Sequence, residues 1–260
     1  MSENTPSYWR EYFRRNGAPR STAALAPGYV QANLIVLPKE NAWDFMLFCV
    51  RNPKPCPLLD VTEPGDPVPH IAAPDADLRT DLCRYVIYED GVRKDEVENI
   101  LDVWRKDLVC FLLGCNFSMD PELKKAGIPV PHEASNNADA MYISSIQSTP
   151  AGVFRGPVVV SLRAIAACHV SRAVQITSRY PACHGAPVHI GDPRIIGISD
   201  LSRVDFGNPT PVRSGEVPVF WGCGVTPQAI AMGIRLPFMI THKPGHMFLT
   251  DLTLADVAAY

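Results

Sequence analysis

The stretch GPVVVSLRAIAACHVSRAVQITSRYPACHGAPVHIG, residues 156–191, decides the fold class. Its start, 156–163, is an apolar and β-branched run that predicts a strand, while 164–180 has the composition of a long helix. Residues 186–191 predict a second strand. Strand, helix and strand in succession indicate an α/β protein, a layered sheet with helices on its faces.

The same alternation extends in both directions from this stretch. We predict helices at 7–16, 41–52, 104–114 and 226–235, and strands at 29–38, 83–91, 141–147, 217–222 and 237–242. Prolines crowd residues 53–74 and predict an extended segment that is either a functional loop or a wrap over the core. No internal repeat has a fixed period. We expect one unit over 1–260, and a break in the pattern near 128–140 leaves open a second, smaller α+β subdomain.

Composition excludes several classes of protein. Hydrophobic residues make up 47% and charged residues 20%, as in ordinary globular proteins. With 24 basic residues among 27 acidic ones and a net charge of -3, we expect no nucleic-acid partner. No apolar run approaches the ~20 residues of a membrane helix, and the N-terminus lacks a secretory signal, so we expect a cytoplasmic protein without a membrane partner. The 8 cysteines form no C-x-x-C pair, which indicates reduced thiols.

The densest polar segment is TSRYPACHGAPVHIGDP, residues 177–193. His189 could act as a general base if the carboxylate of Asp192 holds one ring nitrogen. Ser178 and Arg179 are candidates for binding substrate, and His184 for an acid. The alternative is that His189 is a sheet histidine with its own partners and that Asp192 caps the helix begun by Pro193.

FWGCGVTPQ, residues 220–228, is the second candidate segment. Gly224 lets the backbone approach a ligand, and the helix N-terminus at Thr226 to Gln228 could hold a carboxylate. Cys223 is either a nucleophile activated at that helix N-terminus or a residue small enough to fit between two glycines. Small size is the favoured explanation.

Two further segments carry candidate groups. THKPGHMFLTD, residues 241–251, offers His242 and His246, but their spacing across Pro244-Gly245 is not the helical spacing of a metal site, and hydrogen-bonding roles are favoured. GCNFSMD, residues 114–120, offers Cys115, Asn116, Ser118 and Asp120, with capping of the next helix as the alternative for Ser118 or Asp120.

A resemblance to a known family rests on strings spread over most of the chain: GYVQANLIVLPK, LFCVRNPKPCPLLDVTEPGDP, GCNFSMD, AVQITSRYPACHGAPVHIGDP, VPVFWGCGVTPQ and ITHKPGHMFLTD. Together they resemble the D-glutamate cyclase family, whose bacterial members carry the name hydro-lyase. The resemblance implies an α/β fold and the cyclisation of D-glutamate to 5-oxo-D-proline with loss of water.

The sequence departs from the family pattern at a few positions. MYISSI stands where MYRTNI is usual, so Ile143 replaces a cation and Ser145 an amide. GCNFSMD and RTDLCRYV also differ from the usual GCSFSFE and RTDLPRYR. If the missing Arg binds a substrate carboxylate, this chain handles D-glutamate poorly and prefers a less charged substrate.

We therefore expect a lyase, a hydro-lyase or lactam-forming cyclase acting on a small amino acid or related carboxylate. His189 with Asp192 would supply the base, His184 or His246 the acid, and Arg179 with the helix at Thr226 the positive field. No cofactor is expected. Two alternatives remain open: a hydrolase using Mn²⁺ or Mg²⁺ on His184, His189, Asp192 and His246, and a non-catalytic metabolite-binding protein. The oligomeric state is open, with a homo-oligomer as one outcome.

Overall fold

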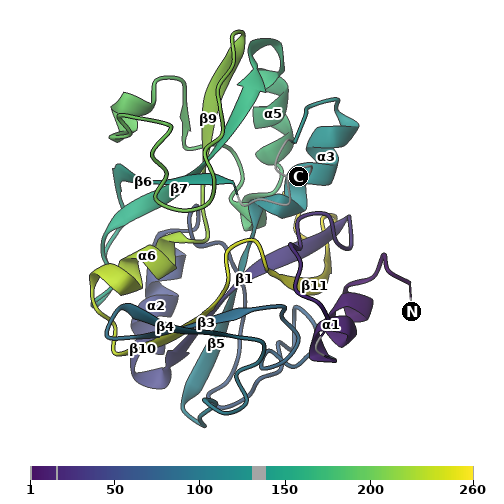
Figure 1. Cartoon of the computed structure of the whole chain (residues 1–260), viewed down its shortest axis with the longest axis vertical. Helices are drawn as coiled ribbons and strands as arrows, with labels where there is room; N and C mark the ends of the chain where they lie inside the picture. Colours follow the sequence, from purple (N-terminus) through teal and green to yellow (C-terminus); the bar gives the residue numbers. More distant parts are fainter. Residues whose placement is uncertain (1, 16, 131–138, 260) are drawn as a thin grey trace.

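The computed structural model describes residues 2–15, 17–130 and 139–259, and it contains two antiparallel sheets (Figure 1). The larger sheet has the strand order β2 (Leu58–Val61), β5 (Leu108–Gly114), β1 (Tyr29–Pro38), β10 (Phe238–His242), β3 (Tyr85–Glu89) and β4 (Val92–Val97), and β11 (Phe248–Thr253) also pairs with β1. The smaller sheet has the order β6 (Ala140–Gln147), β7 (Pro157–Ala166), β9 (Glu216–Gly222) and β8 (His189–Ile190).

Helices accompany both sheets, and the α/β class predicted from the sequence is confirmed. They are α1 (Pro6–Arg14), α2 (Lys39–Arg51), α3 (Asp120–Lys125), α5 (Val170–Thr177) and α6 (Thr226–Gly233). All strand pairs in the described residues are antiparallel. The rule that places ligands at the carboxyl ends of parallel strands therefore does not locate a site here.

The chain passes between the two sheets twice. It leaves the larger sheet after β5, builds the smaller sheet from β6 to β9, and returns for β10 and β11. The break expected near 128–140 falls largely on residues 131–138, outside the described residues. The sequence analysis did not foresee that the chain passes back to the larger sheet between β9 and β10.

Strand β1 is the centre of the larger sheet because both of its faces are apolar and buried. Ile35 and Leu37 face one core, which α2 closes with Phe45 and Phe48. Leu34, Val36 and Ala32 face the opposite core, which contains Ala72 and Ala73 of the proline-rich segment. That segment is therefore a wrap over the core.

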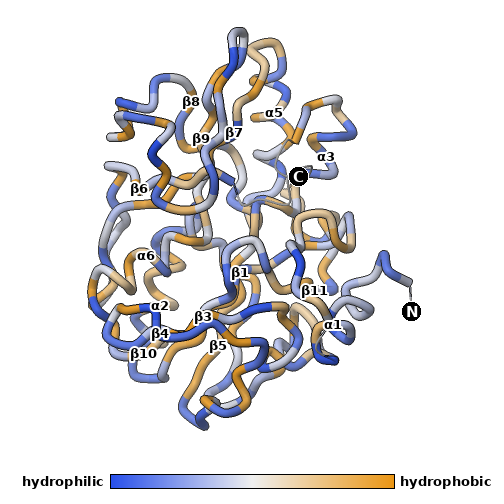
Figure 2. The backbone as a smooth tube through the Cα atoms, viewed as in Figure 1, coloured by the Kyte–Doolittle hydropathy of each residue, from blue (hydrophilic) through white to orange (hydrophobic). Residues whose placement is uncertain are grey.

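The helix predicted at 104–114 is wrong, because residues 108–114 form strand β5. Every residue of this strand is buried, and its side chains alternate between the two cores of the larger sheet. A strand covered on both faces is a continuous apolar run, which periodicity cannot distinguish from a buried helix. In Figure 2 β5 is drawn mainly in apolar orange, while the exposed β4 is mainly hydrophilic blue.

Other predicted elements are shifted or were not foreseen. The helix predicted at 164–180 begins only at Val170, because residues 164–166 continue β7. The strand predicted at 186–191 is reduced to two residues. Strands β4 and β11 follow charged or histidine-rich turns and were not predicted.

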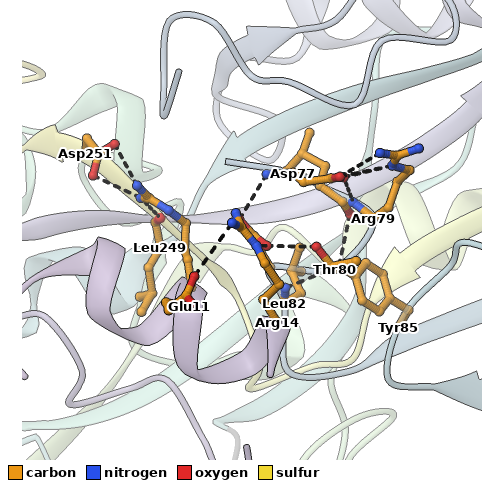
Figure 3. Close-up of polar contacts among 12 residues, drawn as sticks. Glu11, Arg14, Asp77, Arg79, Thr80, Leu82, Tyr85, Leu249 and Asp251 are labelled. Atoms are coloured by element: carbon orange, nitrogen blue, oxygen red, sulfur yellow. Dashed lines mark hydrogen bonds and ion pairs between the residues drawn. The ribbon is translucent and has the colours of Figure 1, made fainter. Parts of the chain in front are cut away.

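Two arginines fasten helix α1, one to β11 of the larger sheet and one to the segment before β3 (Figure 3). Arg10 donates two hydrogen bonds of 2.9 Å to the carboxylate of Asp251 and one to the carbonyl of Leu249. Arg14 donates from Nε to the buried carboxylate of Asp81 at 2.7 Å. Within the described residues, no helix is long and apolar enough to cross a membrane.

Candidate functional site

A pocket lies between the two sheets, with an empty volume of about 350 Å³ that includes the solvent at its mouth. Its walls come from β1, the end of β5 and the turn after β10 on one side, and from β6, β7 and the end of β9 on the other. The enclosed space within it is about 30 Å³. The polar residues that line it are Asn33, Cys115, Asn116, Asp139, Ser161, Cys223 and His242.

Two amide side chains in the pocket are held in fixed orientations. Asn33 donates from Nδ2 to the carbonyls of Leu113, at 3.2 Å, and Gly114, at 3.0 Å. Asn116 donates from Nδ2 to the hydroxyl of Ser161 at 2.8 Å, which joins the two sheets across the pocket. Because both Nδ2 groups donate to protein partners, the Oδ1 atoms of the two amides are the acceptors that the side chains offer.

His242 is a neutral imidazole at the end of β10. Its side chain is buried, and burial lowers its pKa to about 4. Nδ1 lies 3.2 Å from the backbone N–H of Leu34 and 3.4 Å from its carbonyl oxygen; we assign the shorter contact as a hydrogen bond that Nδ1 accepts, which places the proton on Nε2. His242 therefore brings an uncharged N–H donor to the pocket.

Behind the pocket, three buried charges form a cluster. Arg163 of β7 pairs with Asp120 at 2.7 Å and lies 3.8 Å from the carboxylate of Asp139, which lines the pocket. Burial opposes the charge of Arg163, but the two carboxylates outweigh it and raise its pKa. Breaking such a buried arrangement leaves an uncompensated charge, so we assign it a role in fixing the pocket wall.

Cys115 and Cys223 line the pocket from opposite sheets. Burial raises the pKa of both thiols, that of Cys223 to about 12, and in each case a backbone N–H two residues later in the chain acts in the opposite direction. The neighbouring Cys223 also contributes to the raised pKa of Cys115. Both are therefore protonated at neutral pH.

The structure places His189 and Asp192 away from the pocket, and their arrangement differs from the expected base pair. His189 Nε2 lies 2.8 Å from the backbone carbonyl of Asp192, not from its carboxylate. That carboxylate caps the turn at Pro193 by accepting from the N–H of Arg194 and also pairs with the Arg194 side chain. The capping alternative describes Asp192 correctly.

Ser178 and Arg179 also lie outside the residues that line the pocket. The Ser178 hydroxyl donates to the carbonyl of Gln175, and the Arg179 carbonyl accepts from the N–H of Ala259. These contacts close the end of α5.

His184, His246 and Ser118 lie next to the pocket without facing each other. His184 is buried with a left-handed backbone, φ 74°, and donates from Nδ1 to the carbonyl of Lys54 at 2.7 Å. Burial lowers its pKa to about 4. His246 belongs to the turn that lines the pocket, and its Nδ1 lies 3.2 Å from the carbonyl of Pro244. Burial lowers the pKa of His246 as well.

The segment 220–228 reaches the pocket through Cys223 and Val225, while its other predicted residues have structural partners. A Cβ on Gly224 would lie 2.2 Å from Asn33, so the absence of a side chain admits Asn33 rather than a ligand. Thr226 accepts through Oγ1 from the N–H of Val159. Gln228 donates to the hydroxyl of Tyr88.

Ile143 and Ser145 do not line this pocket. Ile143 is 41% exposed on β6 and borders a separate, open depression with Asp200, Arg203 and Asp205. The inference about D-glutamate drawn from the missing Arg therefore has no support from the position of Ile143.

No metal centre is evident in the part of the chain that the structure describes, since no group of three or more His, Cys, Asp or Glu side chains is placed to hold an ion. The four ligands considered for a hydrolase are not gathered at one point. His184 contacts Lys54, and His189 contacts the turn at Asp192.

Sequence reasoning missed three of the polar residues of the pocket, Asn33, Asp139 and Ser161, while Asn116 belongs to the candidate segment 114–120. Two of them had a usable signal, because Asn33 and Ser161 interrupt the apolar runs that predict β1 and β7. A polar residue in a strand buried on both faces needs a partner or a ligand.

Comparisons with known proteins agree with the resemblance noted in the sequence. A family model described as D-glutamate cyclase matches residues 109–251. The chain is 56% identical over 243 residues to a Geobacillus kaustophilus protein named "putative hydro-lyase", covering 94% of this chain and 92% of that one. A Stutzerimonas stutzeri protein of the same name is 54% identical over 248 residues, covering 95% and 94%.

Among solved structures, the chain is similar to a nitrogen repressor-like protein from Methanococcus jannaschii. The TM-score is 0.41 at 13% identity, with 85% of this chain and 86% of that one covered. This likeness is too distant to bear on the fold or the function.

Proposed function

Because the chain belongs to the D-glutamate cyclase family, we propose that it is a hydro-lyase that removes water from a small amino acid or a related carboxylate. Cyclisation of D-glutamate to 5-oxo-D-proline is the first reaction to test. The observation that carries the proposal is the pocket between the sheets. Six of its seven polar lining residues, all but Asn33, lie within the matched range 109–251.

Lactam formation sets clear requirements on the pocket. The α-amine attacks the γ-carboxyl carbon, a C–N bond forms, and one carboxyl oxygen leaves as water. The ammonium group must lose two of its three protons, and the departing oxygen must gain two to leave as water. Two carboxylates of the substrate must also be held apart and oriented.

The pocket residues suit these requirements by their chemistry. The Asp139 carboxylate is a natural partner for the substrate ammonium, and the Nε2–H of His242 is a donor for a carboxyl oxygen. The fixed pair Asn116 and Ser161 offers neutral polar contacts for orientation. Neutral donors in a largely buried pocket strengthen as charge develops on the substrate.

The test is to incubate the purified protein with D-glutamate and with a panel of amino and hydroxy acids, and to follow loss of one water by mass. We expect a dehydrated product from at least one of them. Ser161→Ala should lower its formation by about 10-fold to 100-fold through lost orientation, with Ser202→Ala, a change in an exposed turn, as the matched control. No dehydrated product from any compound would overturn the proposal.

A further inference from the structure

The two thiols of the pocket occupy equivalent positions in two copies of one local structure. The pattern Gly-Cys-x-x-Ser/Thr occurs at Gly114–Ser118 and again at Gly222–Thr226. In each copy the glycine is the last residue of a strand, β5 or β9, and a helical turn follows. Each strand pairs antiparallel with a long neighbour, β5 with β1 and β9 with β7.

The hydrogen bonds of the two copies correspond one to one. The N–H of Cys115 donates to the carbonyl of Gln31 at 2.9 Å, and the N–H of Cys223 donates to that of Val159 at 3.0 Å. In return, the N–H of Gln31 donates to the hydroxyl of Ser118 at 2.9 Å, and that of Val159 to Thr226 at 3.0 Å. The two loops are therefore the same structural unit, one on each sheet.

The correspondence extends to the pocket wall. Two residues beyond Gln31 and Val159, the neighbouring strands present Asn33 and Ser161 to the pocket. Two residues beyond each cysteine, Phe117 and Val225 also line it. Each half thus supplies one thiol, one polar strand residue and one apolar residue to the same cavity.

The differences between the halves are complementary. The long Asn33 fills the space beside Gly224, where a Cβ would be only 2.2 Å away. Asn116 occupies the position in the first unit that Gly224 occupies in the second. The short side chain of Ser161 leaves room for Asn116, whose amide donates to the Ser161 hydroxyl. The two units therefore interlock around the cavity.

We propose that Cys115 and Cys223 form an acid–base pair that transfers a proton between the two faces of the α-carbon of a bound amino acid. Inversion by a two-base route requires one group on each face of the carbon, and two equivalent loops from different sheets each bring one thiol to the same pocket. The substrate class, a small amino acid or related carboxylate, rests on the proposed function. The proton transfer goes beyond it.

The step is balanced without a cofactor or an oxidant. One cysteine, as the thiolate, removes the α-hydrogen as a proton, and the C–H electron pair passes into the adjacent carboxylate. The other cysteine, as the thiol, gives its proton to the opposite face of the carbon. The substrate is inverted, and the thiol and thiolate have exchanged places.

Both cysteines are thiols at neutral pH, because burial raises both pKa values. One proton must therefore leave the pair when substrate binds, and the backbone N–H groups of Phe117 and Val225 are placed to stabilise the resulting thiolate. This role differs from the expectation that Cys223 is present for its small size alone.

The test uses the whole protein in D₂O with matched D- and L-forms of glutamate, aspartate, serine and alanine. Deuterium at the α-carbon is measured by mass, the enantiomer ratio by chiral chromatography, and dehydrated product in the same samples. Cys115→Ser and Cys223→Ser are compared with Cys168→Ser, a change at an exposed cysteine outside the pocket. Thermal unfolding of each variant checks that it is folded.

We expect the wild type and Cys168→Ser to exchange the α-hydrogen and to invert one of these amino acids. Each pocket variant should lose inversion by ~10²-fold or more, the scale of a lost acid or base. Each should still exchange one enantiomer, and the favoured enantiomer should be opposite in the two variants. If the thiols had only a structural role, the two variants would not favour opposite enantiomers.

The outcomes separate this proposal from the hydro-lyase assignment. Dehydrated product without α-deuterium overturns the thiol pair and leaves the hydro-lyase standing. Exchange without dehydrated product from this panel supports the thiol pair and counts against water loss from these amino acids. Folded pocket variants that keep wild-type inversion, or a wild type inactive in both assays, overturn the thiol pair.

Discussion

The loop 177–193 and the pocket between the sheets differ in how their polar side chains find partners. In the loop, the partners are local: Asp192 binds Arg194, His189 binds the carbonyl of Asp192, and Ser178 binds Gln175. In the pocket, the polar residues come from six separate segments of both sheets. A run of polar residues close together in the sequence thus forms a turn that satisfies its own hydrogen bonds. The polar residues of the pocket come together only in the tertiary structure.

The largest change in stability is expected where the loop 177–193 packs against the end of β5. A Cβ on Gly114, the last residue of β5, would lie 1.7 Å from the backbone carbonyl oxygen of Ala182 in the loop. Gly114→Ala should therefore lower the free energy of unfolding by about 3 kcal/mol or more, because backbone must move. Denaturant unfolding measures this, with Gly233→Ala as the control, since nothing lies near a Cβ there. Equal stability of the two variants would show that the loop does not pack against β5.

The second effect concerns pH and the two buried histidines, one in each region. His184 and His242 both have folded pKa values of about 4, lowered by burial from an unfolded value near 6.5. The unfolded state then binds more protons, so the stability that is present above pH 6.5 is lost as the pH falls toward 4. The loss should amount to about 3 kcal/mol per histidine. His184→Gln and His242→Gln should each flatten the curve of unfolding free energy against pH, and an unchanged slope contradicts the assignment.

A smaller effect tests whether the pocket is joined across the sheets. Asn116→Ala and Ser161→Ala remove the two ends of the hydrogen bond between η1 (Asn116–Met119) and β7. A double-mutant cycle on unfolding free energy should give a coupling of about 1 kcal/mol. Additive effects of the two changes would mean that the bond contributes nothing.

The smallest effect is expected in the loop itself. Asp192→Ala removes a cap on an exposed turn, and no contact links that carboxylate to the pocket in the described residues. The rate at which the Asp192→Ala variant forms dehydrated product should stay within a few-fold of the wild-type rate. A loss of ~10²-fold in a folded variant would restore Asp192 to the catalytic machinery.

Much of the fold follows from local sequence. The strand at 29–38 and the helix after it are where the pattern predicts them, because one is buried on both faces and the other covers a core. Strand β5 could not be distinguished from a helix, since its seven residues are all apolar or small. Strands β4 and β11 depend on partners distant in the chain, which local patterns do not contain.

The site was less predictable for a related reason. Cys115, Cys223 and His242 were identified from their segments, and all three line the pocket. Asn33 and Ser161 sit alone in apolar strands, and only the meeting of the two sheets gives them neighbours. The paired Gly-Cys-x-x-Ser/Thr units are too short to register as a repeat, although their hydrogen bonds correspond throughout.

The comparison of the two regions predicts opposite outcomes for two histidines. His242→Asn and His189→Asn are measured side by side for dehydrated product on the substrate that the wild type turns over, with thermal unfolding as the check on folding. The account predicts that His242→Asn lowers turnover by ~10²-fold or more and that His189→Asn leaves it within a few-fold. A folded His242→Asn variant with wild-type turnover, together with a large loss for His189→Asn, would place the chemistry in the loop and contradict the account.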